Sequence, residues 1–132
     1  MRLGRAAVYA IFAAVHIAEN SRAWPIQGKD IATSCGMPPG RLLKILQQLV
    51  RSRILASERG PAGGFRLRKP ARDISILEII EAIEGPIDGD LFVGDGVATT
   101  ERTRVAVQRA CRDVADFART RLQDLSVHDL AR

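Results

Sequence analysis

Apolar residues recur at helical spacing near the start of the chain, and short apolar runs near its middle have strand character. Val8, Ile11, Phe12 and Val15 follow the i, i+3, i+4, i+7 spacing of one helix face, which predicts a helix over residues 5–19. Further helices are predicted over residues 27–35, about 39–53, 76–84 and about 101–123. Residues 54–57 and 64–67 are predicted to form the two strands of a hairpin.

The rest of the chain is organised around residues 31–67. Two helices that cross steeply need a small residue at the crossing and a residue that tolerates a positive φ in the turn, and Ala32 and Gly36 meet these needs. Pro39 suits the start of the next helix, because the first helical N–H groups have no partner to lose. The sequence therefore predicts a winged helix-turn-helix, in a mainly α fold with a small β-hairpin wing and a long C-terminal dimerisation helix.

Basic and amide side chains fall on the open side of the helix over residues 39–53, opposite an apolar stripe. Such side chains contact phosphates and base edges in protein–DNA complexes. A hairpin tip of glycines between two arginines would fit a narrow minor groove, whose negative potential favours arginine. The candidate DNA-contacting residues are Lys29, Arg41, Lys44, Gln47, Gln48, Arg59, Gly60, Gly63, Gly64 and Arg66.

This region also allows two other interpretations. An amphipathic helical hairpin without DNA-binding function would show the same helix pattern, and only the wing favours DNA binding over it. A phosphate-binding loop is disfavoured, because the glycines are not followed by Gly-Lys-Ser/Thr and no helix starts directly after them.

The segment after the wing carries a helix start signal and a helix stop signal. Ser75 is the predicted N-cap, and Glu78 three residues later would complete a capping box. Gly85 and Pro86 are the predicted C-cap and stop. Residues 86–100 follow as a flexible loop, whose acidic residues lack the spacing of a calcium-binding loop. Those acidic residues are Asp88, Asp90 and Asp95.

The long helix over residues 101–123 carries an apolar stripe that its own domain covers only in part. A second copy of the chain is the simplest partner for such a stripe. The predicted dimer interface consists of Val107, Cys111, Val114, Ala118 and Leu122. The predicted domains are a DNA-binding domain at 1–85, the loop at 86–100, and a dimerisation helix with a C-terminal turn at 101–132.

Charge is unevenly distributed along the 132 residues. The formal net charge is +5, but residues 1–72 hold 13 Lys and Arg against 3 Asp and Glu, whereas residues 73–132 hold 7 against 12. A basic front and an acidic rear suit a DNA-facing module with a separate assembly segment. No nucleophile–base pair or metal-ligand cluster is evident, so we expect neither an enzyme nor a metal site.

The cysteines and the N-terminal segment indicate in which cellular compartment the protein is expected. Cys35 and Cys111 form no disulfide framework, which favours a reduced cytoplasmic setting. Arg2 and Arg5 before the apolar run 6–18 resemble a short signal peptide, but Tyr9 and His16 interrupt the run. The run is also too short to span a bilayer.

The motifs together resemble the Rrf-type family of winged-helix regulators, which includes the iron–sulfur-cluster regulator and the nitric-oxide-sensing repressor. The matching features are Ile31-Ala32…Gly36-Met37, the wing Ser57-x-Arg59-Gly60-x-x-Gly63-Gly64-Phe65-x-Leu67, and Ile74-Ser75-Ile76 through Ala82-x-Glu84-Gly85. The resemblance implies a homodimeric transcription factor, usually a repressor, with each third helix in a major groove and each wing in a minor groove of a palindromic operator. It maps the minor-groove arginine onto Arg59 and base-reading positions onto Pro38, Gly40, Arg41 and Lys44.

The chain departs from this family in two places. Relatives that sense iron or nitric oxide hold a cluster through three closely spaced cysteines, and residues 85–100 contain none, so no cofactor is expected. Pro38, Pro39 and Gly40 replace the more usual hydroxylated or larger residues, so the operator sequence cannot be transferred from a relative.

These observations favour a sequence-specific regulator that binds double-stranded DNA as a homodimer and responds to a small-molecule or protein effector. One alternative is a redox-responsive regulator in which Cys111 or Cys35 is oxidised. The other alternative is a winged-helix module that binds another protein rather than DNA.

Overall fold

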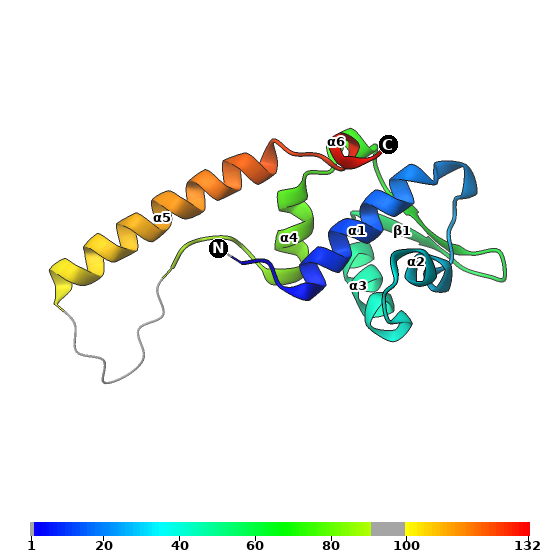
Figure 1. Cartoon of the computed structure of the whole chain (residues 1–132), viewed down its shortest axis with the longest axis horizontal. Helices are drawn as coiled ribbons and strands as arrows, with labels where there is room; N and C mark the ends of the chain where they lie inside the picture. Colours follow the sequence, from blue (N-terminus) through cyan, green and yellow to red (C-terminus); the bar gives the residue numbers. More distant parts are fainter. Residues whose placement is uncertain (1, 91–99) are drawn as a thin grey trace.

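Helices make up most of the computed structural model, with a small β-hairpin at one edge (Figure 1). The structure describes residues 2–90 and 100–132. The helices are α1 (Arg5–Glu19), α2 (Gly28–Cys35), α3 (Pro39–Arg51), α4 (Ile76–Glu84), α5 (Glu101–Gln123) and α6 (Val127–Leu130). Strands β1 (Leu55–Glu58) and β2 (Gly64–Leu67) pair antiparallel, with Leu55 opposite Leu67 and Glu58 opposite Gly64. Short 3-10 turns lie at Ser21–Ala23 and Ala71–Asp73. The predicted fold class is confirmed.

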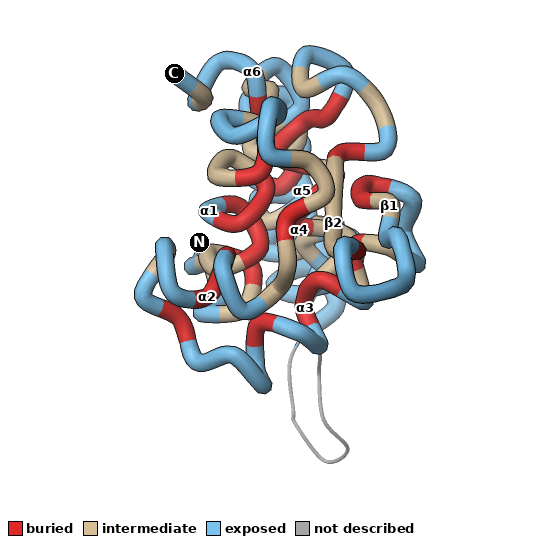
Figure 2. Tube along the Cα trace, turned by 90° about the vertical axis from the view of Figure 1, so that its right-hand side faces the viewer, coloured by how far each residue is buried: buried red, intermediate tan, exposed pale blue. Residues whose placement is uncertain are grey.

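The core lies between α1, α3 and α4, whose buried faces meet in the middle of the winged-helix body, meaning α1 to α4 with the hairpin (Figure 2). The buried face of α1 coincides only in part with the apolar stripe that predicted this helix. Ala10, Ala13 and Ala14 are fully buried, whereas Phe12 is 57% exposed. Small side chains let α1 approach its neighbours closely, so the buried face of this helix is set by alanine and not by its largest apolar residue.

The turn between α2 and α3 has the predicted geometry. Gly36 adopts φ +66°, and the N–H of the buried Met37 donates to the carbonyl of Ala32 at 2.9 Å. The far end of α3 differs from prediction, because the helix ends at Arg51 instead of about residue 53. Arg53 takes a left-handed conformation there (φ +62°), which lets the N–H of Ile54 return to the carbonyl of Leu49 at 3.0 Å.

The start of α4 is capped as predicted, but only by half of the expected capping box. Ser75 Oγ accepts the backbone N–H of Glu78 at 3.0 Å. The Glu78 carboxylate does not turn back to the cap, because it accepts two bonds from Lys69 Nζ, at 2.8 and 3.0 Å. Glu78 therefore ties the end of the wing to α4. Gly85 closes the helix with φ +84°, as predicted.

Helix α5 projects from the winged-helix body on the side opposite the hairpin tip, and the chain after it returns to the body (Figure 1). The N–H of Ile76 donates to Leu125 O at 2.8 Å, and the N–H of Val127 donates to Ile74 O at 2.9 Å. Val127 is fully buried in the core. At the start of α6, Ser126 forms a complete capping box with Asp129. The C-terminal turn thus fixes one end of α5 to the winged-helix body.

No helix among residues 2–90 and 100–132 has the length and apolar character that crossing a membrane requires.

Candidate nucleic-acid interface

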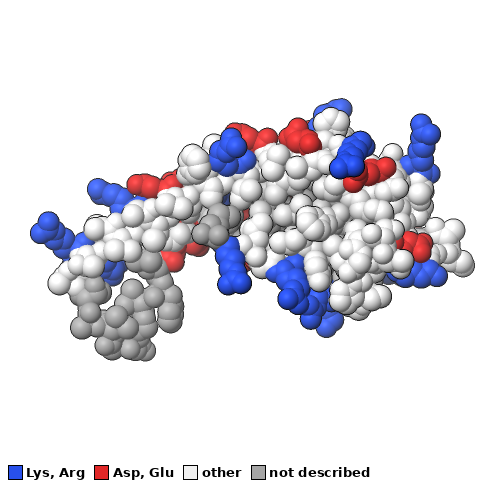
Figure 3. Space-filling view, in the orientation of Figure 1, with Lys and Arg blue, Asp and Glu red and all other residues white. Residues whose placement is uncertain are grey.

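The exposed side of α3 is lined by long polar side chains. Its buried stripe consists of Leu42, Ile45, Leu46 and Leu49. On the opposite side, Lys44 and Gln47 are exposed one turn apart, and Arg51 continues the same row. Lys and Arg side chains gather along the lower edge of the body, close to α3 (Figure 3). The packing that buries the leucine stripe therefore directs the cationic row toward solvent, where it can reach a phosphate backbone or base edges.

Gln48, also predicted to contact DNA, is half-buried on the flank of α3. Its Nε2 donates to the backbone carbonyl of Ala82 in α4 at 3.1 Å, and its Oε1 accepts from an Arg51 guanidinium nitrogen at 2.6 Å. The amide joins α3 to α4 and orients Arg51. Its contact with DNA stays a prediction, and the bonds within the chain give it a structural role that the sequence pattern did not reveal.

Two of the wing glycines are required by the packing of the wing itself. A Cβ at Gly63 would lie 2.2 Å from Glu58 O. At Gly64, where φ is +155°, a Cβ would lie 2.4 Å from the backbone of Ile26, which pairs with Phe65 through N–H···O bonds of 2.8 and 2.9 Å. The sequence interpretation assigned these glycines to a slender tip, and the structure gives them a folding reason as well. Gly60 is exposed at the tip with open space around it.

The two wing arginines differ in their surroundings. Arg66 Nε lies 3.2 Å from Glu58 Oε1, and another of its nitrogens donates to Leu67 O at 3.2 Å. Arg59 is exposed, and no acidic side chain within the described residues forms an ion pair with it. Arg59 is therefore the wing guanidinium that is available to a ligand, and its contact with a minor groove stays a prediction.

A hydrogen bond connects the wing to the start of α2. Gln27 Nε2 donates to Pro61 O, near the hairpin tip, at 3.0 Å. Together with the pairing of Ile26 and Phe65, this bond makes the wing and the helix-turn-helix one unit.

The predicted residue Lys29 is exposed in the first turn of α2, and Pro38, Gly40 and Arg41 are exposed at the start of α3. Leu43 is also exposed on α3, and the sequence analysis did not include it among the site residues.

The five residues of the predicted dimer interface do not share one environment on α5. Val107 and Val114 are exposed, at 45% and 63%. Cys111, Ala118 and Leu122 are half-buried, and lie on the same side of the helix as Ala115, which is buried. Phe117 is 69% exposed and lies one turn from Val114. The most exposed apolar row of α5 is therefore Val107, Ala110, Val114 and Phe117, spaced as in a heptad repeat.

Polar contacts hold the segment after α4 against the inner side of α5. The Glu81 carboxylate pairs with Arg119 and also accepts the N–H of Ile87 at 3.0 Å. Gln108 Nε2 donates to Gly89 O at 3.0 Å. A Cβ at Gly89 would lie 2.5 Å from Cys111 O, so this glycine allows the segment to lie directly on the helix.

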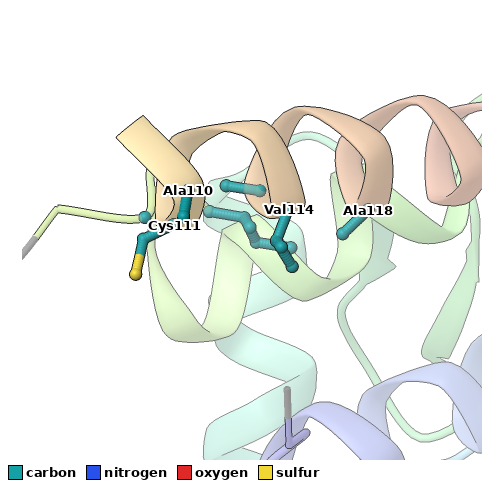
Figure 4. Close-up of a pocket in the computed structure, with 7 residues that line it drawn as sticks. Ala110, Cys111, Val114 and Ala118 are labelled. Carbon is teal, nitrogen blue, oxygen red and sulfur yellow. The ribbon is translucent and has the colours of Figure 1, made fainter. Parts of the chain in front are cut away.

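Cys111 borders a mostly apolar hollow of about 360 Å³ between this segment and α5. Ala110, Cys111, Val114 and Ala118 line the side of α5 that faces the hollow (Figure 4). Cys35 lies far along the chain, at the end of α2, and burial raises the pKa of its thiol above the ordinary value.

The raised pKa of the Cys35 thiol should be measurable as a slower reaction with an alkylating reagent. At pH 8, Cys35 is expected to react with iodoacetamide more slowly than a free cysteine, because a raised pKa leaves less of the nucleophilic thiolate. Mass spectrometry of the native protein against time measures this rate, and the protein unfolded in urea provides the control. Equal reaction rates for Cys35 in the folded and unfolded chain would contradict a raised pKa of this thiol in the folded protein.

The available donor set does not fit an iron–sulfur cluster. Clusters are held by several cysteines close together, and the sequence has two, in α2 and α5. Within the described ranges, no three His, Cys, Asp or Glu side chains come close enough to hold a metal ion. Asp88 and Asp90, part of the rejected calcium-loop interpretation, are described, whereas Asp95 lies outside the described residues.

A family profile and the sequence relatives both indicate a transcriptional regulator. The profile of the family Rrf2, described as "Iron-dependent Transcriptional regulator", matches residues 3–132. The chain is 30% identical over 131 residues to the "Putative HTH-type transcriptional regulator Rv1287" of Mycobacterium tuberculosis (strain ATCC 25618 / H37Rv), covering 99% of this chain and 81% of the relative. It is 33% identical over 96 residues to the HTH-type transcriptional regulator IscR of Escherichia coli, covering 73% of this chain and 59% of IscR.

The solved structures support the fold. The chain superposes on CymR, the global cysteine regulator of B. subtilis, with a TM-score of 0.78 at 21% identity, covering 99% of this chain and 96% of CymR. The oxidized form of Staphylococcus aureus CymR gives a TM-score of 0.76 at 23% identity, covering 100% and 97%. With an exposed cationic helix face beside an arginine-bearing wing, and with a family profile that spans nearly its whole length, the chain belongs to the Rrf2 family of helix-turn-helix transcriptional regulators.

Proposed function

We propose that the chain is a homodimeric repressor that binds a palindromic operator and works without an iron–sulfur cluster. The observation that carries the proposal is the joint presentation of Lys44, Gln47 and Arg59 by one rigid unit of helix-turn-helix and wing. The row on α3 has the chemistry to enter a major groove, and Arg59 extends from the wing toward the neighbouring minor groove. A cytoplasmic location follows from this function, because the operator is there.

The uncovered apolar row on α5 supports the pairing of two copies. Val114 and Phe117 are more than half exposed on a helix that projects from the body. A second α5 would cover them and would set the distance between two DNA-binding units, as a palindromic site requires. The effector, whether a small molecule or a protein, is proposed to act through α5 and the segment that precedes it.

The salt dependence of binding tests the electrostatic part of the proposal. A dimer that neutralises about 6–10 phosphates is expected to lose about 10³–10⁵-fold in affinity between 50 and 200 mM salt. Fluorescence anisotropy on a duplex selected from random sequences measures the slope. An affinity that stays within threefold over this range would exclude phosphate neutralisation as the main source of binding.

Arg59 provides the sharpest single-residue test. Arg59→Ala is expected to weaken binding to the selected duplex by about 1–3 kcal/mol, or about 5–150-fold, because the exposed guanidinium loses its minor-groove contact. Arg102→Ala is the matched control, since Arg102 is also exposed but lies at the start of α5, away from the wing. Equal losses of affinity in both variants would mean that Arg59 contributes to binding only through the net charge of the protein.

A further inference from the structure

The first turn of α3 presents an apolar surface in the middle of the cationic face. Pro38, Pro39, Gly40 and Leu43 are all exposed there. The contrast among the leucines of α3 is marked, because Leu42, Leu46 and Leu49 are fully buried while Leu43 is 45% exposed. Lys44 and Gln47, one position and one turn further along the helix, are also exposed.

Proline suits the start of a helix, but the folding of the chain does not account for the glycine in this turn. Gly40 has helical backbone geometry with no positive φ, and a Cβ there would meet nothing within 4 Å. Where alanine can adopt the native backbone angles, it is more favourable than glycine by about 0.4–1 kcal/mol, so the position carries a local penalty that packing does not require. A missing side chain on an exposed surface allows a ligand to approach the helix backbone closely.

The same turn is poorly suited to hold a phosphate. Helix N-termini bind anions through free backbone N–H groups, and proline has none. Pro38 and Pro39 occupy the N-cap and the first helical position, so the two outermost donors of this N-terminus are absent. The turn keeps the N–H groups of Gly40 and Arg41, but most of its exposed surface is apolar and lies next to Lys44 and Gln47, whose polar groups can bond to base edges.

Among the base edges of the major groove, the one apolar group is the C5-methyl group of thymine. We propose that Leu43, beside the apolar Pro38–Gly40 turn, reads thymine methyl groups, so that each operator half-site carries thymine where the first turn of α3 docks. The inference rests on the proposed DNA-binding function. It adds a specificity-determining residue, whereas Lys44 and Gln47 bond to the neighbouring acceptors.

Uracil provides a direct test, because it keeps every hydrogen-bonding group of thymine and lacks only the methyl group. Thymines of the selected duplex are replaced one at a time, symmetrically in both half-sites, and binding is measured by anisotropy. At one or two positions, we expect the native protein to lose about fourfold per methyl group and about 15-fold for the symmetric pair.

Leu43→Ala is expected to bind the thymine and uracil duplexes within twofold of each other at those positions, with the salt slope unchanged. Leu130→Ala is the matched control, since Leu130 is an exposed leucine on α6, and it should keep the full discrimination. Thermal unfolding of both variants confirms that a surface change has left the fold intact.

Two results would overturn the inference. If the native protein bound every uracil duplex within twofold of the parent, no methyl group would be read. If Leu43→Ala kept the discrimination, another residue would read it. Both results leave DNA binding intact, whereas failure to bind any selected duplex would overturn the proposed function and this inference together.

Discussion

Replacing Phe117 with glutamate is expected to convert paired chains into single copies and to lower operator affinity by about 100-fold or more. Phe117 is 69% exposed and Val114 beside it is 63% exposed. Both belong to the exposed apolar row of α5 described above, which is called the outer row here and consists of Val107, Ala110, Val114 and Phe117. Burying a phenylalanine contributes about 1.5–3 kcal/mol, and a symmetric interface contains two of them. Losing the second DNA-binding unit also removes the gain from simultaneous binding, which is about 10²–10⁴-fold.

Val105→Glu is the matched control for this prediction. Val105 is an exposed valine on the same helix, but it lies on the polar side among Arg109, Arg112 and Asp116. Light scattering after gel filtration should give a single-copy mass for Phe117→Glu and a two-copy mass for Val105→Glu. Two copies in both variants would move the dimer interface away from the outer row of α5.

The second large effect concerns the fold. Gly64→Ala is expected to lower the free energy of unfolding by about 2–4 kcal/mol, because its Cβ would lie 2.4 Å from the Ile26 backbone at a positive φ. Backbone atoms cannot move aside as the end of a flexible side chain can. The pairing of Ile26 with Phe65 would have to break, and the wing would lose its attachment to α2.

Gly40→Ala makes the same chemical change where space is open, and it is expected to raise the free energy of unfolding by about 0.4–1 kcal/mol. Urea unfolding at one fixed protein concentration measures both variants, since the proposed pairing would make stability depend on concentration. A Gly64→Ala variant within 0.5 kcal/mol of the native protein would contradict the packing described for the wing.

Local signals explain which parts of the fold could be predicted. The ends of α2, α3 and α4 follow from Gly36, Pro39, Ser75 and Gly85, because each of these residues acts within a few positions of itself. The capping box at Ser75 was predicted in full but forms only in half, because Lys69, nine residues before Glu78, takes the carboxylate. Sequence spacing does not report such competition.

Long-range contacts account for what the sequence did not reveal. The pairing of Ile74 with Val127 joins residues 53 positions apart, and no periodic pattern indicates it. In the candidate site, residue type suggested arginine and glutamine as DNA contacts, and whether each side chain is available for such a contact depends on its neighbours. Glu58 engages Arg66, and the Ala82 carbonyl engages Gln48, whereas Arg59 is left for a ligand.

The central claim is that two copies, paired through α5, place two cationic α3 helices and two wings on one operator. Native mass spectrometry of the protein with the selected palindromic duplex tests it most directly. The account predicts a complex of two chains and one duplex at low salt, and little complex on a duplex that carries one half-site. A complex of one chain per duplex, equally abundant on both duplexes, would contradict it.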